Sequence, residues 1–221
     1  GTPYPESGGR FRVPDMLANR ADVHNLGDVL TGHDDLFALS YIENALTSNP
    51  VLAPLAGRDL ADVELLVRMA DGDDVPIDQL SHPYGPTELG GVVAVLRTLR
   101  HVQRVVMAVN AAYIASAGQD DAFRTEPPFL LQGSYRNMNK LAERVVPGMN
   151  DAEVEALIDD HYRAEAQTLT SGAEHNLLKL AQLRGRSTAA QLERWDQVTR
   201  AYARVQATAT TRWPRSPASS A

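Results

Sequence analysis

The stretch 87-TELGGVVAVLRTLRHVQRVVMAVNAAYIAS-116 decides the fold class of this chain. Its apolar residues recur every three or four positions over about eight turns, as on one face of an α-helix. Thr87 is the expected N-cap, although the pair Gly90-Gly91 weakens the first turn by about 1 kcal/mol per glycine. The stretch therefore predicts a long helix with one face in the core.

Shorter segments on both sides of this helix show the same period, and each has its own start or stop signal. Acidic, Ser or Asn residues stand where N-caps are expected, and Gly or Pro residues follow the expected ends. Ser171 and Glu174 have the spacing of a capping box. No alternating strand of useful length appears, so the sequence predicts a mostly α fold. Further helices are expected over residues 34–48, 59–72, 134–146, 152–169, 171–184 and 188–208.

Length and composition limit the classes of protein to consider. The chain has 221 residues, of which 43% are hydrophobic and 22% charged, as in an ordinary globular protein of one or two domains. It has no cysteine, which excludes disulfides, thiol catalysis and Cys-ligated zinc. Its net charge of −7 disfavours broad, nonspecific binding to nucleic acid. No apolar run reaches the roughly 18 residues of a membrane span.

Most of the chain offers no catalytic or metal-binding motif. The six histidines form no HxxxH or HExxH pair, so no metal site is predicted. Neither the nucleophile elbow G-x-S-x-G nor the phosphate-binding P-loop occurs. The acids of Asp159-Asp160-His161 point to different faces of a helix, and a solvated face is the favoured interpretation.

A basic stripe, Arg97, Arg100 and Arg104, follows the helical period within the long helix. It could contact nucleic acid or an acidic partner. Because the whole chain is acidic, we favour a solvated helix face for it.

Two other arginines have more informative surroundings. Arg20 follows a loop rich in glycine and proline, and Arg136 falls at helix position N2 if Ser134 is the N-cap. Free N–H groups and the positive end of the dipole make such a helix start favourable for an anion and unfavourable for a bare cation. Arg136 therefore indicates an anionic ligand or an ion pair with an acid such as Glu126, and the residues alone do not decide between them.

Several phrases of the chain resemble a known family. Near the N-terminus these are Thr2-Pro3-Tyr4-Pro5-Glu6, Gly8-Gly9, Val13-Pro14-Asp15 and Arg20. Longer ones are Leu17-Ala-Asn-Arg-Ala-Asp22, Ser40-Tyr-Ile-Glu-Asn-Ala-Leu-Thr-Ser-Asn-Pro50, Arg124-Thr-Glu-Pro-Pro128 and Leu131-Gln-Gly-Ser-Tyr-Arg-Asn-Met-Asn-Lys140. The first group resembles part of the MoxR-type AAA+ ATPases. Nearly the whole span 3–185 resembles the C-terminal end of very large bacterial proteins described as DNA-repair ATPases.

The resemblance implies roles for individual residues. Thr2 stands at the sensor 1 position, where the family has Asn. Arg20 stands at the arginine-finger position, which reaches the γ-phosphate held by a neighbouring subunit, although the family's Asp-Arg-Phe is Asn19-Arg20-Ala21 here. Arg136 stands at sensor 2, which reaches the γ-phosphate of its own subunit, with Ser134 beside it in the nucleotide contact.

The resemblance also implies a domain organisation and partners. Residues 1–85 would be the C-terminal part of the AAA+ core, residues 86–206 a helical lid and residues 207–221 a disordered tail. ATP and Mg²⁺ would be bound mainly by an upstream part carrying the P-loop and Walker B acids, so this chain alone should not hydrolyse ATP. The implied setting is a ring oligomer in a bacterial cytoplasm that remodels a protein substrate, with direct nucleic-acid contact disfavoured and no membrane association.

Two alternatives remain at the level of sequence. One is a noncatalytic helical interaction module, which would bind a partner through the 87–116 helix or through the acidic surface. The other is a DNA-contacting helical domain that uses the basic stripe of Arg97, Arg100 and Arg104.

Overall fold

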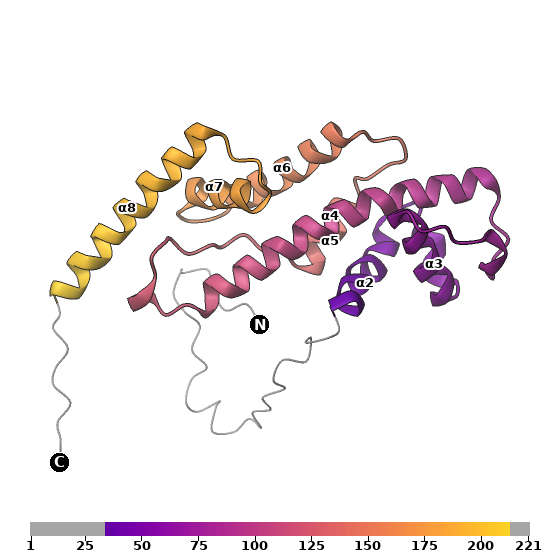
Figure 1. Ribbon diagram of the computed structural model, residues 1–221, viewed down its shortest axis with the longest axis horizontal. Coiled ribbons are helices and arrows are strands. Elements are labelled where there is room, and N and C mark those ends of the chain that lie inside the picture. Colours follow the sequence, from indigo (N-terminus) through magenta and orange to yellow (C-terminus); the bar gives the residue numbers. More distant parts are fainter. Residues whose placement is uncertain (1–33, 213–221) are drawn as a thin grey trace, which may run out of the picture.

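A computed structural model describes residues 34–212 and shows a mostly α fold, as predicted (Figure 1). Within this part of the chain there are helices, short 3₁₀ turns and loops but no strand. The helices are α2 (Asp34–Ala45), α3 (Leu60–Asp71), α4 (Pro86–Gly118), α5 (Tyr135–Ala142), α6 (Asp151–Gln167), α7 (Ala173–Leu183) and α8 (Ala189–Arg212).

Helix α4 is the long axis of the molecule. It has 33 residues, and Figure 1 shows it running along most of the structure, with α2 and α3 near its N-terminal end. The residues with the predicted period are buried, and they are Val92, Val95, Leu96, Leu99, Val102, Val106, Val109 and Tyr113. Because this face is buried, helices that precede α4 in the sequence and helices that follow it pack against the same helix.

A single hydrophobic core joins α2, α3, α4, α5, α6 and α7. It contains Tyr41 from α2, Val63 from α3, Leu99 from α4, Leu141 from α5 and Ile158 from α6. Helix α3 packs on α4, so residues before and after the predicted boundary at 85/86 share this core. The described parts of the two predicted domains thus form a continuous packed body.

Helix α5 is held at both ends by residues far away in the sequence. Just before it, Gly133 lies against α4, where a Cβ would stand 1.9 Å from the carbonyl oxygen of Val106. The Tyr41 hydroxyl donates to the Gly133 carbonyl at 2.8 Å. Beyond its last turn, the buried amide of Asn49 donates to the carbonyls of Ala142 and Val145, each at 2.8 Å. These contacts fix the position of α5 at both of its ends.

Several predicted helix caps are confirmed. The Asp59 carboxylate accepts from the Ala61 N–H at 3.0 Å, and Gly72 ends α3 in the left-handed region with φ of 104°. Asn150 caps α6 through a reciprocal capping box with Glu153. These features are local, which is why the sequence predicts them well.

Two predicted helix starts are wrong. Helix α4 begins one residue before Thr87, because Pro86 takes position N1 and Gly85 is the N-cap. Helix α7 has Gly172 as its N-cap, with φ of 86° and no side-chain cap, so the capping box predicted from Ser171 does not form. Glu174, its expected partner, pairs with Arg194 instead.

Two helix ends also differ from the prediction. Helix α5 ends at Ala142 rather than near Val146, because Val145 donates back to Ala142 in a tight turn. Helix α8 continues to Arg212, so residues 207–212, predicted as part of a disordered tail, are helical. No glycine or proline occurs between Gly185 and Pro214, which explains why the helix is longer than predicted.

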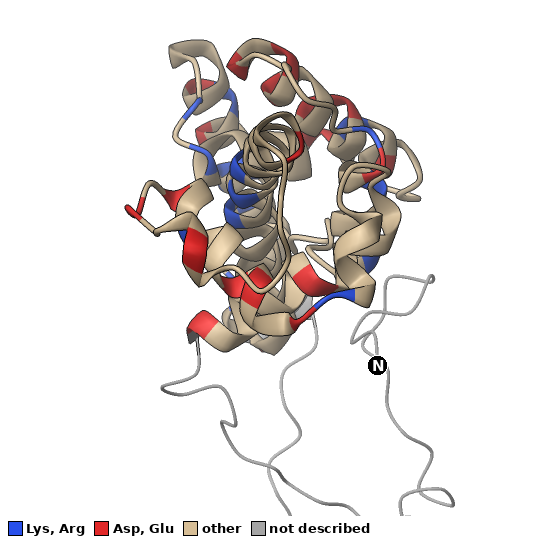
Figure 2. Ribbon diagram, turned by 90° about the vertical axis from the view of Figure 1, so that its right-hand side faces the viewer, with Lys and Arg blue, Asp and Glu red and all other residues tan. Residues whose placement is uncertain are grey.

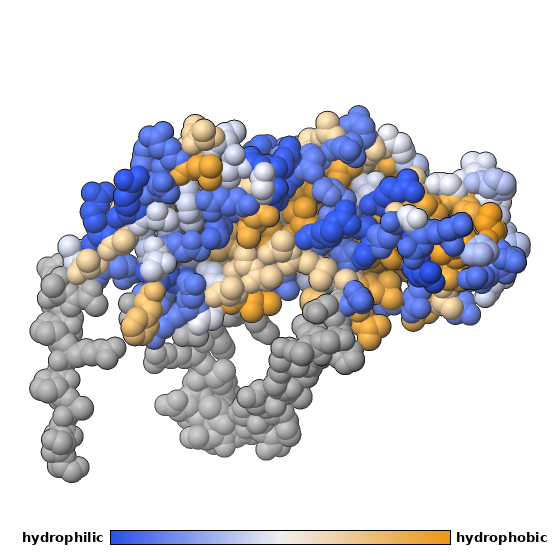
Figure 3. Space-filling model, in the orientation of Figure 1, coloured by the Kyte–Doolittle hydropathy of each residue, from blue (hydrophilic) through white to orange (hydrophobic). Residues whose placement is uncertain are grey.

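The surface is mostly hydrophilic on the face drawn in Figure 3, with apolar side chains showing along its middle and toward the α2–α3 end. None of the helices in residues 34–212 combines the length and apolar character needed to cross a membrane.

Candidate anion-binding site

The predicted site residues fall into two groups. Thr2 and Arg20 lie outside the described residues. Ser134 and Arg136 lie at the start of α5, where Ser134 is the N-cap and Arg136 occupies N2, as predicted. The Ser134 hydroxyl accepts from the Asn137 N–H, while the Asn137 side chain accepts from the Ser134 N–H. This capping box holds the first turn of α5 in place.

Arg136 borders a cavity of about 620 Å³ between α5 and α6, together with two further cations, Lys140 and Arg144. All three side chains belong to exposed residues. None of them forms an ion pair with another described residue within 4.0 Å. Arg136 and Lys140 are one helical turn apart, so they share one face of α5. The cavity therefore has a basic rim on a chain that is acidic overall.

The floor of this cavity is a hydrogen-bonded network of neutral and acidic groups. Asn137 donates to Glu165 Oε2 at 2.6 Å, and its amide nitrogen lies 3.1 Å from His161 Nε2. Glu165 Oε1 accepts from the Gln132 N–H at 2.8 Å. The carboxylate of Glu165 thus accepts hydrogen bonds from the loop and from α5, and leaves the three cations unpaired.

The buried groups of the floor have shifted pKa values. Burial, with repulsion from Lys140 and Arg144, lowers the pKa of His161 to about 4. The neutral imidazole can accept the Asn137 hydrogen bond through Nε2. His161 Nε2 also lies 3.7 Å from Glu165 Oε2, but the two groups do not form an ion pair at neutral pH because the ring is uncharged. Burial raises the pKa of Glu165, opposed by its hydrogen bonds and by nearby cations. The positive charge of the site at pH 7 therefore comes from its rim.

The ion pair considered for Arg136 in the sequence does not form. Glu126 accepts two hydrogen bonds from Lys179 instead, at 2.8 and 2.9 Å. Asp160, another acid at the cavity, pairs with Arg163 at 2.8 Å. Of the two interpretations left open by the sequence, the structure removes the pair with Glu126.

The basic stripe on α4 is largely occupied by contacts within the protein. Arg97 donates to the Ala70 carbonyl at 3.3 Å, and Arg100 pairs with Asp71 at 2.9 Å. These contacts attach α4 to the C-terminal end of α3. Arg104 is exposed on α4. Only part of the stripe is thus available to an external ligand, in keeping with the favoured interpretation as a helix face.

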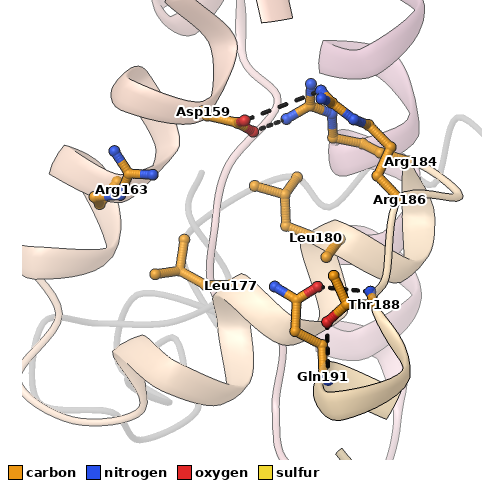
Figure 4. A pocket seen from close by; sticks show the side chains of 9 residues that line it. Asp159, Arg163, Leu177, Leu180, Arg184, Arg186, Thr188 and Gln191 are labelled. Carbon is orange, nitrogen blue, oxygen red and sulfur yellow. Dashed lines mark hydrogen bonds and ion pairs between the residues drawn. The ribbon is translucent and has the colours of Figure 1, made fainter. Parts of the chain in front are cut away.

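A second cavity of about 350 Å³ lies between α6, α7 and the start of α8 (Figure 4). Arg184, buried to 6% exposure, contacts both Glu155 and Asp159, and Arg186 also contacts Glu155. The solvated face predicted for 159–161 fits Asp159 and Asp160, whose side chains are 43% and 58% exposed, but is wrong for His161, whose side chain is 11% exposed where α5 packs on α6. Basic and acidic segments lie beside each other over much of the molecule (Figure 2).

Lys140, Arg144 and His161 are members of the site that the sequence interpretation did not include. Lys140 and Arg144 follow Arg136 at intervals of four residues, and this spacing places all three on one face of the predicted 134–146 helix, although α5 ends at Ala142 and Arg144 lies just beyond it. Nothing local to His161 indicates that it would meet Asn137. Within residues 34–212, no group of three His, Asp or Glu side chains is arranged to hold a metal ion.

Comparisons with known proteins identify no relative. No protein-family model, no curated protein and no solved structure matches the chain.

Proposed function

We propose that this chain is the C-terminal portion of a bacterial, cytoplasmic AAA+ ATPase of the MoxR-like kind, in which Arg136 contacts the γ-phosphate of ATP. Residues 86–206 would serve as the lid. The P-loop, the Walker B acids and most contacts to ATP and Mg²⁺ would come from a separate upstream part, so this chain alone is not an ATPase.

The observation that supports the proposal is the placement of Arg136. It stands at N2 of α5, exposed, beside a cavity of about 620 Å³ and without an ion-pair partner among the described residues. A guanidinium at the positive end of a helix is unfavourable by a few tenths of a kcal/mol or more, and an anion bound there would offset that cost. The N–H groups of the first turn favour the same anion.

The reaction chemistry agrees with such a group. Phosphoryl transfer spreads negative charge over the γ-phosphate oxygens, and a planar guanidinium stabilises that charge through paired hydrogen bonds. In the proposed ring, Arg136 would act on the ATP of its own subunit and Arg20 on that of a neighbour. Thr2 would orient the attacking water, and Ser134 would fix the helix that carries Arg136.

The proposal extends to the work of the ring. ATP hydrolysis would drive the remodelling of a protein substrate. The resemblance to proteins described as DNA-repair ATPases suggests that this work belongs to DNA repair. Direct nucleic-acid contact is not expected, because the chain carries a net charge of −7 and two arginines of the α4 stripe are occupied.

The test joins this chain to an upstream polypeptide that carries the P-loop and Walker B acids, and measures ATP hydrolysis by the joined protein. Arg20→Ala should lower kcat by about 10³-fold or more and leave nucleotide binding largely intact. Arg136→Ala should lower kcat as well, whereas the exposed Arg104→Ala should have no effect. A fully active joined protein carrying Arg20→Ala and Arg136→Ala would refute the proposal.

A noncatalytic interaction module is the second candidate. The apolar face of α4 is buried, so a partner would contact that helix through its exposed residues or would bind the acidic surface. Ile114 and Phe123, near the end of α4, nevertheless remain 59% and 79% exposed. Partner binding that needs no nucleotide, survives Arg136→Ala and fails in Phe123→Ser would favour this candidate.

A further inference from the structure

We infer that the cavity between α5 and α6 binds a linear polyphosphate chain, free or carried by a nucleoside triphosphate, through Arg136, Lys140 and Arg144 acting together. The inference deepens the proposed function, because it rests on phosphate meeting Arg136 and adds two residues that the sequence did not assign. Its basis is the balance of charge and hydrogen bonding around the cavity.

The rim has positive charge that the protein does not neutralise. The two acids at the cavity are Asp160, which pairs with Arg163, and Glu165, which accepts from Gln132 and Asn137. Lys140 and Arg144 both act on His161, whose pKa they lower, so both lie close enough to influence the floor. Lys140 and Arg136 act in the same way on Glu165. The three cations thus line one cavity, and none of them forms an ion pair with a described carboxylate.

The spacing of the cations favours an extended anion over a compact one. Arg136 and Lys140 are separated by one turn, a rise of about 6 Å along the helix. A chain of phosphates can extend from one of these groups to the next and carries more negative charge than a single phosphate, so it matches three cations better. The cavity volume of about 620 Å³ lies within the usual range for small-ligand sites, roughly 300–1,000 Å³. A phosphate chain fits both the charge and the space.

A nucleic-acid strand is the less favoured occupant. Its many phosphates need a long basic surface, but the chain has a net charge of −7 and Arg97 and Arg100 are bound to α3. Three cations without an ion pair among the described residues gather around one cavity, which suits a short anion.

The experiment is calorimetric titration of the full 221-residue chain at low salt with tripolyphosphate, ATP and orthophosphate. We expect tripolyphosphate and ATP to bind at least about tenfold more tightly than orthophosphate. Arg136→Ala, Lys140→Ala and Arg144→Ala should each weaken binding about five- to tenfold, as expected for loss of one charge-assisted contact. Arg104→Ala removes the same charge elsewhere and should change nothing, and Lys140→Arg should retain binding.

A second measurement reports on the cavity itself. Bound phosphate should raise the pKa of His161 above its value of about 4, because the anion stabilises the imidazolium, and NMR titration of the ring follows this. Equal ATP and tripolyphosphate affinities would mean that only the phosphate chain is recognised; tighter ATP binding would add a nucleoside contact. Both outcomes support the inference.

Other outcomes overturn it. Absence of tripolyphosphate binding would refute the inference, while the proposed function would still depend on the ATPase test of the joined protein. Binding lost in Arg136→Ala but unchanged in Lys140→Ala and Arg144→Ala would remove the inference and leave the proposed function standing. A single-stranded oligonucleotide could also bind more tightly than tripolyphosphate and lose affinity in all three variants. That result would overturn the inference, because it would identify nucleic acid as the ligand of the cavity.

Discussion

Helix α6 lies between two arginine-containing clusters that differ in charge balance. Toward α7, Arg184 and Arg186 contact Glu155 and Asp159, so their charge is matched inside the protein. Toward α5, Arg136, Lys140 and Arg144 border a cavity and contact no described carboxylate. We call the first the closed cluster and the second the open cluster.

The comparison shows that residue type does not define the role of an arginine. Arg184 is 6% exposed, and its charge is tolerated there because two acids surround it. Arg136 is exposed, and Glu165, an acid of the same cavity, accepts hydrogen bonds from neutral donors. The closed cluster should therefore contribute to stability, and the open cluster to binding.

The largest expected effect concerns the platform of the open cluster. Gly133→Ala should destabilise the protein by at least about 3 kcal/mol, because the new Cβ would lie 1.9 Å from the Val106 carbonyl oxygen and 2.4 Å from the Asn110 nitrogen, both backbone atoms. Urea denaturation measures the loss. Gly91→Ala is the matched control: its Cβ meets nothing within 4 Å and should stabilise α4 by about 1 kcal/mol. Equal effects of the two changes would contradict the close approach of Gly133 to α4.

The next effect tests the closed cluster directly. Arg184→Ala should cost about 2–3 kcal/mol of unfolding free energy, because it leaves Glu155 and Asp159 with less neutralising charge. Arg163→Ala removes an ion pair of the same kind whose two side chains are each 58% exposed, and should cost less than about 0.5 kcal/mol. If both changes cost the same, burial does not distinguish the two pairs.

The third effect concerns pH and the floor of the open cluster. The pKa of His161 falls from 6.5 in the unfolded chain to about 4 in the folded protein, so the unfolded state binds the extra proton first. Stability from the neutral ring is complete above pH 6.5 and is lost as the pH falls toward 4, by up to about 2 kcal/mol after allowance for solvent near the ring. Chemical denaturation at several pH values measures the slope.

The control for this prediction is His161→Gln, which should remove the His161 part of the slope. Other groups remain in both proteins: the lowered pKa of His175 gives a slope of the same sign, and the raised pKa of Glu165 gives one of opposite sign. The difference between the two proteins therefore isolates His161. An unchanged slope in His161→Gln would show that the ring is not held neutral by its surroundings.

The smallest effect sharpens the comparison most. Arg136→Ala should leave stability unchanged or raise it by up to about 0.5 kcal/mol, because it removes a cation from the positive end of α5. The same change should weaken phosphate binding, so stability and binding move in opposite directions. A clear loss of stability in Arg136→Ala, measured by thermal unfolding, would place Arg136 among the structural arginines of the closed cluster.

Much of the local structure follows from the sequence. The period of the 87–116 stretch predicts α4, and Ser134 as N-cap places Arg136 at N2. Such predictions succeed because a helix period and its caps involve residues only three or four positions apart. Where a nearby glycine or proline competes, as at Gly85-Pro86 and Gly172, the predicted cap moves.

The candidate site was only partly predictable. Arg136 has a local signal, and Lys140 and Arg144 have one in their spacing. The alternative ion pair between Arg136 and Glu126 could be tested only in the tertiary structure. There Glu126 pairs with Lys179, which lies 53 positions further along the sequence. His161 gave no signal, because its burial depends on the approach of α5 to α6.

The sequence by itself determined that the chain is helical, where most helices begin and end, and that Arg136 stands at a positive helix end. Tertiary structure decided which charges find partners: it gave Arg184 two acids, gave Glu126 to Lys179 and left the rim of the α5–α6 cavity unpaired. The physical reason is range, since caps and periods are set within a few residues, whereas an ion pair depends on where packing brings distant helices together.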